Sequence, residues 1–192
     1  RDVAPSRGLG DVYKRQVSLL ILCPVIAIFL PTAPLIVQLL LTKSFLPVIP
    51  FLSWAILGMI FKVTSTCLGY ILIVKGAHRL FLGTELLSWS TILITNIIGY
   101  NIWGIEGIGI AFLFSYAFYL TIMITICKKT FNITFNKEVL QLSLFTIAIA
   151  IISFISIYYL VPIDPLSGYF LCTILIVFSM FITLRELWHH IK

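Results

Sequence analysis

Six apolar segments, each long enough to cross a membrane as a helix, dominate this sequence. They lie at residues 17–41, 47–74, 80–101, 105–127, 139–161 and 166–187. About 20 apolar residues in a helix span a hydrocarbon core of about 30 Å. Lipid gives backbone N–H and C=O groups no hydrogen-bond partner, so each span has to satisfy its own. We therefore predict an all-α membrane protein with six transmembrane helices.

The composition excludes a soluble domain. The chain of 192 residues is 60% hydrophobic and only 10% charged, with a mean hydropathy of +1.12. A soluble domain of this length carries about a quarter charged residues. The formal charge of +6 does not indicate nucleic acid as a partner, because the basic residues are dispersed among short loops and form no single patch.

The loops alternate in charge, and this alternation predicts the topology. The segments after the second, fourth and sixth spans carry Lys75, Arg79, Lys128, Lys129, Lys137, Arg185 and Lys192. The segments after the first, third and fifth spans carry one basic residue, Lys43. Basic loops stay in the cytoplasm, so both ends of residues 17–192 are expected there. The alternation also has the parity that six spans require.

Residues 1–16 differ in composition from everything that follows. The run Arg7–Gln16 resembles a peptide produced when sequencing adaptor is translated onto a broken gene end. We therefore expect residues 1–16 to be a non-native or disordered tail, with residues 17–192 as one polytopic membrane domain. A native basic cytoplasmic tail is the alternative. The segment has no small-residue cleavage site after an apolar stretch, so it is not a signal peptide.

No residue pattern indicates an enzyme, a metal site or a cofactor. The four cysteines, Cys23, Cys67, Cys127 and Cys172, are far apart and within or beside apolar runs. They form no CxxC pair and lie near no histidine cluster, so neither a metal site nor a disulfide framework is expected. We find no nucleophile–base set and no paired carboxylates, and we predict no catalytic residues.

Lys62 is the residue that most strongly suggests a function. It lies near the middle of the second span, where a cation costs at least about 2.5–3.5 kcal/mol. Gly58, Lys62, Ser65 and Gly69 share one small, polar helical face. An ammonium offers three donors to a phosphate or carboxylate. The four residues therefore predict a substrate-binding face, with a structural pairing of Lys62 to another helix as the alternative.

Two further features lie on the third and fourth spans. Glu85 is near the cytoplasmic end of the third span and is a candidate for a proton or sodium coupling site; an interfacial carboxylate close to water is the alternative. Gly107, Ala111 and Ser115 recur every four residues on the fourth span. Such a stripe of small residues predicts close helix packing.

A series of short motifs resembles a known family over residues 24–129. The motifs are Leu39–Phe45, Phe51–Gly58, Phe61–Val63, Leu68–Leu72, Lys75–Gly76 with Phe81 and Glu85 beyond, Gly104–Ala111 and Ser115–Tyr116. In order and spacing they resemble bacterial O-antigen translocases, the polysaccharide flippases of the multidrug/oligosaccharidyl-lipid/polysaccharide exporter superfamily. The last two apolar spans fit the C-terminal end of that family without marking it.

The resemblance implies a flippase of the bacterial inner membrane that works by alternating access. It would move an oligosaccharide linked to undecaprenyl diphosphate, with membrane lipids and other polysaccharide assembly proteins as further partners. The six spans would be the C-terminal part of a transporter helical bundle. Carried over to this chain, Lys62 would face the lipid diphosphate or an anionic sugar, and Glu85 would be the coupling site.

Other functions fit parts of the same sequence. A cation-coupled drug exporter or a lipid II flippase of the same superfamily would share the fold and differ in substrate. A membrane polysaccharide polymerase or glycosyltransferase is less favoured, because it needs a large outer loop with Arg or carboxylate groups. A purely structural membrane subunit would leave Lys62 without a role.

Overall fold

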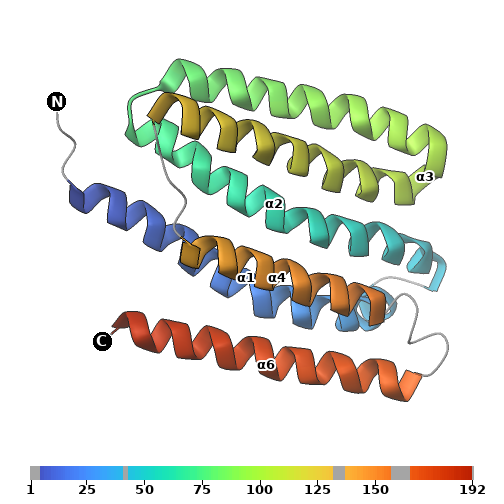
Figure 1. Ribbon diagram of the computed structural model, residues 1–192. Coiled ribbons are helices and arrows are strands. Elements are labelled where there is room, and N and C mark those ends of the chain that lie inside the picture. Colours follow the sequence, from blue (N-terminus) through green and yellow to red (C-terminus); the bar gives the residue numbers. More distant parts are fainter. Residues whose placement is uncertain (1–4, 41–42, 132–136, 157–164, 192) are drawn as a thin grey trace.

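The computed structural model describes residues 5–40, 43–131, 137–156 and 165–191, and over these residues the protein is built from helices (Figure 1). The elements are α1 (Pro5–Leu40), a short 3-10 helix η1 (Lys43–Val48), α2 (Ile49–Val74), α3 (His78–Phe131), α4 (Lys137–Ile155) and α6 (Pro165–Ile191). The all-helical class predicted from the apolar segments is confirmed.

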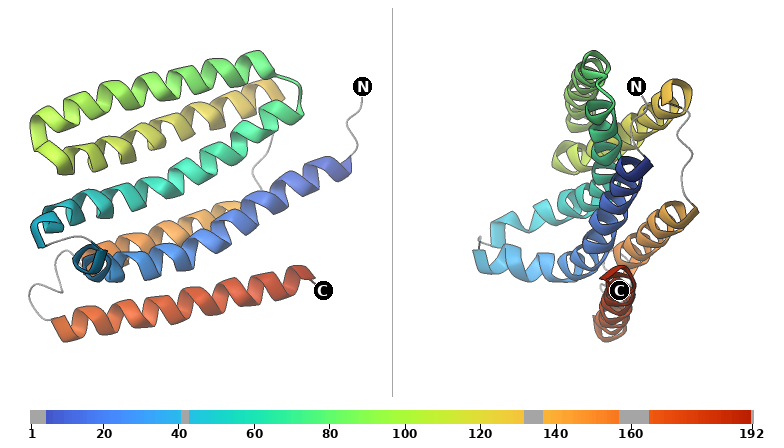
Figure 2. Two further views of the ribbon diagram at one scale, coloured as in Figure 1. Left: turned by 180° about the vertical axis from the view of Figure 1, so that it is seen from behind. Right: turned by 90° about the vertical axis from the view of Figure 1, so that its left-hand side faces the viewer.

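Gly104 divides α3 into two antiparallel legs. Its backbone has φ 63° and ψ −138°, a conformation that is essentially restricted to glycine. The first leg is residues 78–103 and the second leg is residues 105–131, and Figure 2 shows them lying side by side. A single glycine thus turns one continuous apolar sequence into a helical hairpin.

Three helices of the described residues are long and apolar enough to cross a membrane. They are α2, α3 and the stretch Ser167–Arg185 of α6, and two shorter apolar stretches, Ile21–Pro34 and Leu144–Ile155, lie in α1 and α4. These lengths support membrane insertion. The predicted count of six spans is not reached by this criterion, because α3 counts as one helix and the apolar parts of α1 and α4 are short within the described residues.

The helix α1 begins before the first predicted span and includes residues 5–16. Once a helix is nucleated, each further residue that is fixed adds one backbone hydrogen bond, whereas the first bond requires three residues to be fixed, so a helix that starts in an apolar segment can extend into a polar one. Residues 1–4 lie outside the described residues, as do residues 157–161 of the fifth predicted span.

The helices run alongside one another, with α2 between the α3 hairpin and the remaining helices (Figures 1 and 2). One core cluster joins α2 to α1 and α4 and consists of Ile26, Leu30, Leu57, Ile60, Ala150 and Phe154. A second joins α2 to the second leg of α3 and consists of Leu68, Ile71, Leu72, Tyr116, Tyr119, Met123 and Cys127. Since α2 contributes to both clusters, it is the central packing element.

Large apolar side chains cover the outside of the first leg of α3 and of α6. The exposed ones include Leu82, Leu86, Trp89, Leu93, Ile97, Trp103, Phe170, Val177, Phe181 and Leu184. Soluble monomers rarely expose apolar surface of this extent. These faces are suited to contact with lipid chains.

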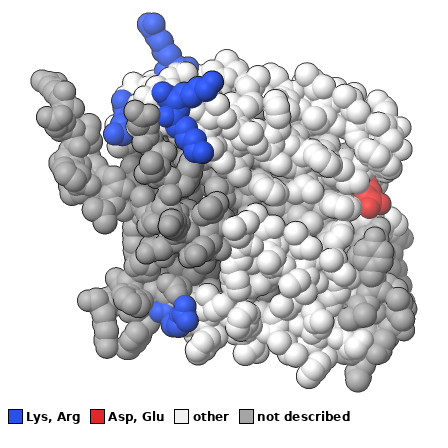
Figure 3. Space-filling view, in the orientation of Figure 1, with Lys and Arg blue, Asp and Glu red and all other residues white. Residues whose placement is uncertain are grey.

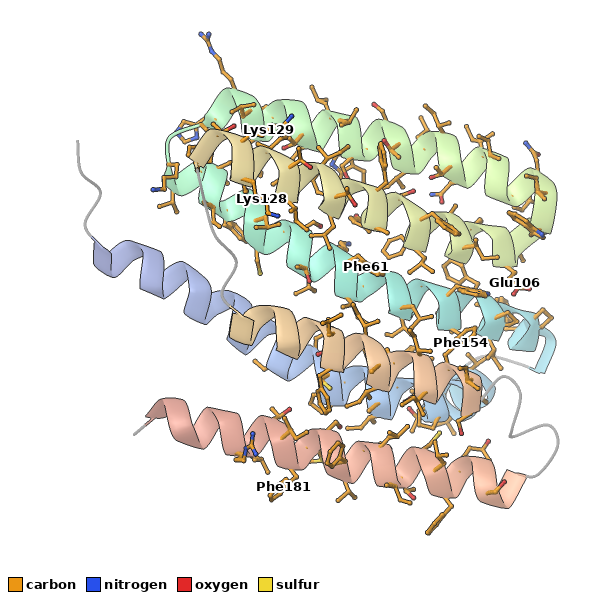
Figure 4. The ribbon with its side chains drawn as sticks, in the orientation of Figure 1. Phe61, Glu106, Lys128, Lys129, Phe154 and Phe181 are labelled. Carbon is orange, nitrogen blue, oxygen red and sulfur yellow. The ribbon has the colours of Figure 1, made fainter. Side chains whose placement is uncertain are left out.

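In Figure 3, the Lys and Arg side chains lie toward one end of the bundle and an acidic group lies at the other end. Lys75 and Arg79 flank the turn between α2 and α3, and Lys128 and Lys129 are in the last turn of α3, at the same end. Glu106 lies at the other end, beside the Gly104 turn (Figure 4). The bundle therefore has one basic end and one end that carries a carboxylate.

Candidate functional site

A pocket of about 210 Å³ lies between α2 and the two legs of α3. Its walls combine one cation, one carboxylate, two hydroxyl side chains and five aromatic rings. The lining residues are Lys62, Thr66, Tyr70, Phe81, Glu85, Ser88, Trp89, Tyr116 and Tyr119. A pocket with apolar walls and a few convergent polar groups is the usual form of a small-ligand site.

Lys62 enters this pocket from the middle of α2. Its side chain is partly buried, and the Nζ atom lies 5.5 Å from the centre of the Tyr116 ring and 5.7 Å from that of Phe112. An ammonium within about 6 Å of an aromatic face is attracted by the ring quadrupole. Among the residues that the structure describes, the ammonium makes contacts with aromatic rings and no ion pair with a carboxylate.

Glu85 enters the same pocket from the first leg of α3. The Tyr119 hydroxyl, on the second leg, donates a hydrogen bond of 2.9 Å to its Oε1 atom. Tyr119 is only 4% exposed, so its ring is held by the surrounding core. A carboxylate and a cation thus share one pocket. The carboxylate is hydrogen-bonded to Tyr119, and the ammonium lies over two aromatic rings.

The face of α2 that lines the pocket differs from the predicted one. Lys62, Thr66 and Tyr70 form it, at intervals of four residues. At about 100° per residue, Thr66 and Tyr70 are rotated to one side of Lys62, whereas Gly58 and Ser65 are rotated to the other. Of the four predicted substrate-binding residues, only Lys62 therefore reaches the pocket.

Gly58 and Gly69 instead allow α3 to approach α2 closely. A Cβ atom at Gly58 would lie 2.6 Å from Phe112 Cδ1, and one at Gly69 would lie 3.3 Å from Phe81 Cε2. Ser65 is fully buried, and its hydroxyl donates to the Lys62 carbonyl oxygen at 2.9 Å. The absence of a side chain at Gly58 and Gly69 lets Phe112 and Phe81 pack against α2. Phe112 then lies beside Lys62, and Phe81 lines the pocket.

Gly107, Ala111 and Ser115 lie at the contact between the two legs of α3. A Cβ atom at Gly107 would overlap the Gly99 carbonyl oxygen. Further along, the hydroxyls of Ser115 and Thr95 are hydrogen-bonded at 2.6 Å, and Ser115 also donates to the Ala111 carbonyl oxygen. The structure thus places the small stripe where the hairpin closes on itself.

Most of the aromatic lining was not identified from the sequence. Tyr70 is eight residues after Lys62, and that spacing could have indicated a shared face. Tyr116 and Tyr119 are one turn apart in the second leg, but only the fold of the hairpin brings them beside α2. In a chain this rich in aromatic residues, spacing alone does not distinguish lining rings from core or lipid-facing ones.

Potential metal ligands and the cysteines form no site among the residues that the structure describes. Within the described residues, no group of three or more His, Cys, Asp or Glu side chains could hold a metal ion. The four cysteines form no disulfide, and Cys23, Cys127 and Cys172 are buried.

Comparison with protein-family models, curated proteins and solved structures finds no match for this chain.

Proposed function

We propose that this chain is part of a flippase that moves a lipid-linked oligosaccharide, carried on undecaprenyl diphosphate, across the bacterial inner membrane. The observation that carries the proposal is Lys62, a cation at the middle of a membrane-spanning helix, in a pocket and without a carboxylate partner among the described residues. A cation at such a depth is costly and is typical of a substrate or ion path.

The remaining walls of the pocket suit an amphiphilic anion. The ammonium of Lys62 offers three donors to a phosphate group. Phe81, Trp89 and the tyrosines provide flat apolar faces beside hydroxyl groups. A sugar or an isoprenoid chain can lie against such faces while the phosphate is held by the cation. The resemblance of residues 24–129 to O-antigen translocases supports the same substrate class.

The pocket extends from the middle of α2 toward the basic end of the bundle. From Lys62 to Tyr70 it covers eight residues, or about 12 Å of helix, and Lys75 follows shortly after. We propose six spans, namely α1, α2, the two legs of α3, α4 and α6, with the basic ends in the cytoplasm. In this orientation the pocket lies on the cytoplasmic half of the membrane, where a substrate enters before it is flipped.

A cation-coupled drug exporter is the competing function, because Glu85 and the aromatic rings are groups that bind organic cations. Lys62 lies in the same pocket and would repel such a ligand. Glu85 already accepts the Tyr119 hydrogen bond, whereas Lys62 has no carboxylate partner among the described residues, and this difference favours an anion over a cation. A lipid II flippase would share the diphosphate lipid, and exchanging the sugar in a flipping assay separates it from an O-antigen flippase.

The test is export of surface polysaccharide by the intact protein in a strain that lacks its own copy. Lys62→Ala should strongly reduce export at normal membrane levels of the protein, because the pocket loses its cation. Lys62→Arg should keep part of the activity. Lys129→Ala, an exposed lysine at the end of α3, is the matched control and should export normally. Full export by Lys62→Ala would remove Lys62 from the mechanism.

A further inference from the structure

We propose that Tyr119 is a positioning residue that keeps Glu85 away from Lys62, so that the ammonium stays available to an anionic ligand. The inference rests on the proposed function, since it assigns Lys62 a phosphate-bearing ligand. It adds a new role for the Glu85–Tyr119 pair: the carboxylate is a built-in competitor of the ligand, and the tyrosine restrains it.

The geometry supports this role directly. Lys62 and Glu85 line one pocket of about 210 Å³, yet each has another partner. The ammonium rests over the Tyr116 and Phe112 rings, and the Oε1 atom of Glu85 accepts the Tyr119 hydrogen bond. Opposite charges that share a partly buried site attract strongly, so something must hold them apart.

Tyr119 is suited to that restraint. It belongs to the buried cluster between α2 and the second leg of α3, with Met123 and Cys127 one and two turns further along the helix. A ring fixed in this way aims its hydroxyl at one place, and a hydrogen bond to a carboxylate is stronger than one between neutral groups. Without the hydroxyl, Glu85 loses this partner, and Lys62 is the cation in the same pocket.

The first experiment measures the Lys62–Glu85 ion pair without a ligand. The intact protein in lipid nanodiscs is treated with a small amine-reactive reagent, and the labelling rate of Lys62 is followed by mass spectrometry. Tyr119→Phe should slow labelling several-fold, because the ammonium becomes paired. Adding Glu85→Gln to Tyr119→Phe should restore the original rate. Tyr100→Phe, which removes a hydroxyl from the first leg outside the pocket, is the matched control.

The second experiment measures competition with a ligand, using farnesyl diphosphate as the probe, with inorganic diphosphate and farnesol as its separate head and tail. Tyr119→Phe should weaken farnesyl diphosphate binding by about tenfold, the cost of breaking one charged contact. The double variant Tyr119→Phe/Glu85→Gln should bind as tightly as Glu85→Gln alone. Farnesol binding should not respond to either change.

The outcomes separate the two proposals. If Lys62 labelling is the same in Tyr119→Phe and the original protein, or is slowed equally in the Glu85→Gln background, the restraint by Tyr119 is wrong. A different outcome is that labelling changes as expected while farnesyl diphosphate binds neither the original protein nor Tyr119→Phe, or binds Lys62→Ala as tightly as the original protein. In that case the restraint of Glu85 by Tyr119 stands, and the diphosphate ligand of the proposed function is wrong.

Discussion

Gly99 and Gly107 meet backbone to backbone across the α3 hairpin, and neither position has room for a Cβ atom. Gly99 comes shortly before the turn at Gly104 and Gly107 shortly after it, so their contact lies where the two legs of α3 are joined. Close approach at this point brings Thr95 and Ser115 within hydrogen-bond distance one to two turns further along. The α3 hairpin forms two walls of the pocket, and its close packing depends on Gly99 and Gly107, which lie outside the pocket.

Gly107→Ala should destabilise the protein, because the added methyl group would overlap the Gly99 carbonyl oxygen and force the legs apart. Overpacking of this kind costs about 1–3 kcal/mol. The midpoint of thermal unfolding in detergent is the measurement. Gly83→Ala is the matched control on the same helix: Gly83 is exposed with nothing within 4 Å, so alanine there should be neutral or slightly stabilising. Equal midpoints for the two variants would contradict this account of the hairpin.

The Trp54–Glu106 hydrogen bond should stabilise the end of the bundle opposite the basic residues. Trp54 Nε1 donates to Glu106 Oε1 at 2.9 Å, and the indole ring also contacts Phe154 of α4 at 4.7 Å between centroids. In a double-mutant cycle, Trp54→Phe and Glu106→Ala should show a coupling of about 1–2 kcal/mol. Trp54→Phe combined with Lys128→Ala, at the other end, should be additive. Additivity of the first pair would mean that the hydrogen bond contributes nothing to stability.

Lys62→Met should raise stability while it removes function. A lysine at the centre of a membrane helix costs about 2.5–3.5 kcal/mol, partly offset here by the Tyr116 and Phe112 rings. An apolar side chain of similar length avoids this cost, so the unfolding midpoint should rise by about 2–4 °C for each kcal/mol gained. Lys128→Met, at an exposed position, should change little. A clear fall in the midpoint for Lys62→Met would instead indicate a structural role.

The proposed orientation predicts opposite accessibility for the Gly104 turn of α3 and for the C-terminal end of that helix. In a variant whose four native cysteines are replaced, Asn101→Cys should react with a membrane-impermeant thiol reagent added to intact cells. Lys128→Cys should react only after the cytoplasmic side is opened. Both positions are exposed in the structure, so access to the reagent is the variable being tested. Labelling of Lys128→Cys in intact cells would contradict the proposed orientation and place the basic end outside.

The sequence by itself determined the class of the protein and the residue on which the functional proposal depends. Long apolar runs with few charges favour helices in a membrane, because lipid accepts such surface and a helix satisfies its own backbone hydrogen bonds there. A single lysine near the middle of one run stands out for the same reason. The four-residue repeat of Gly107, Ala111 and Ser115 likewise predicted a close helix contact, and these residues lie between the two legs of α3.

Only the tertiary structure decided what surrounds that lysine. The periodicity of α2 assigned Gly58, Ser65 and Gly69 to the face of Lys62, but a helix buried on several sides has no single functional face. Gly58 and Gly69 pack against α3, and Ser65 is buried with its hydroxyl bonded to the Lys62 carbonyl oxygen. The positive φ of Gly104 folds α3 back on itself and brings Tyr116 and Tyr119 beside Lys62 and Glu85. Helical spacing specifies which residues of one helix share a side, whereas the contents of a pocket depend on where the neighbouring helices cross it.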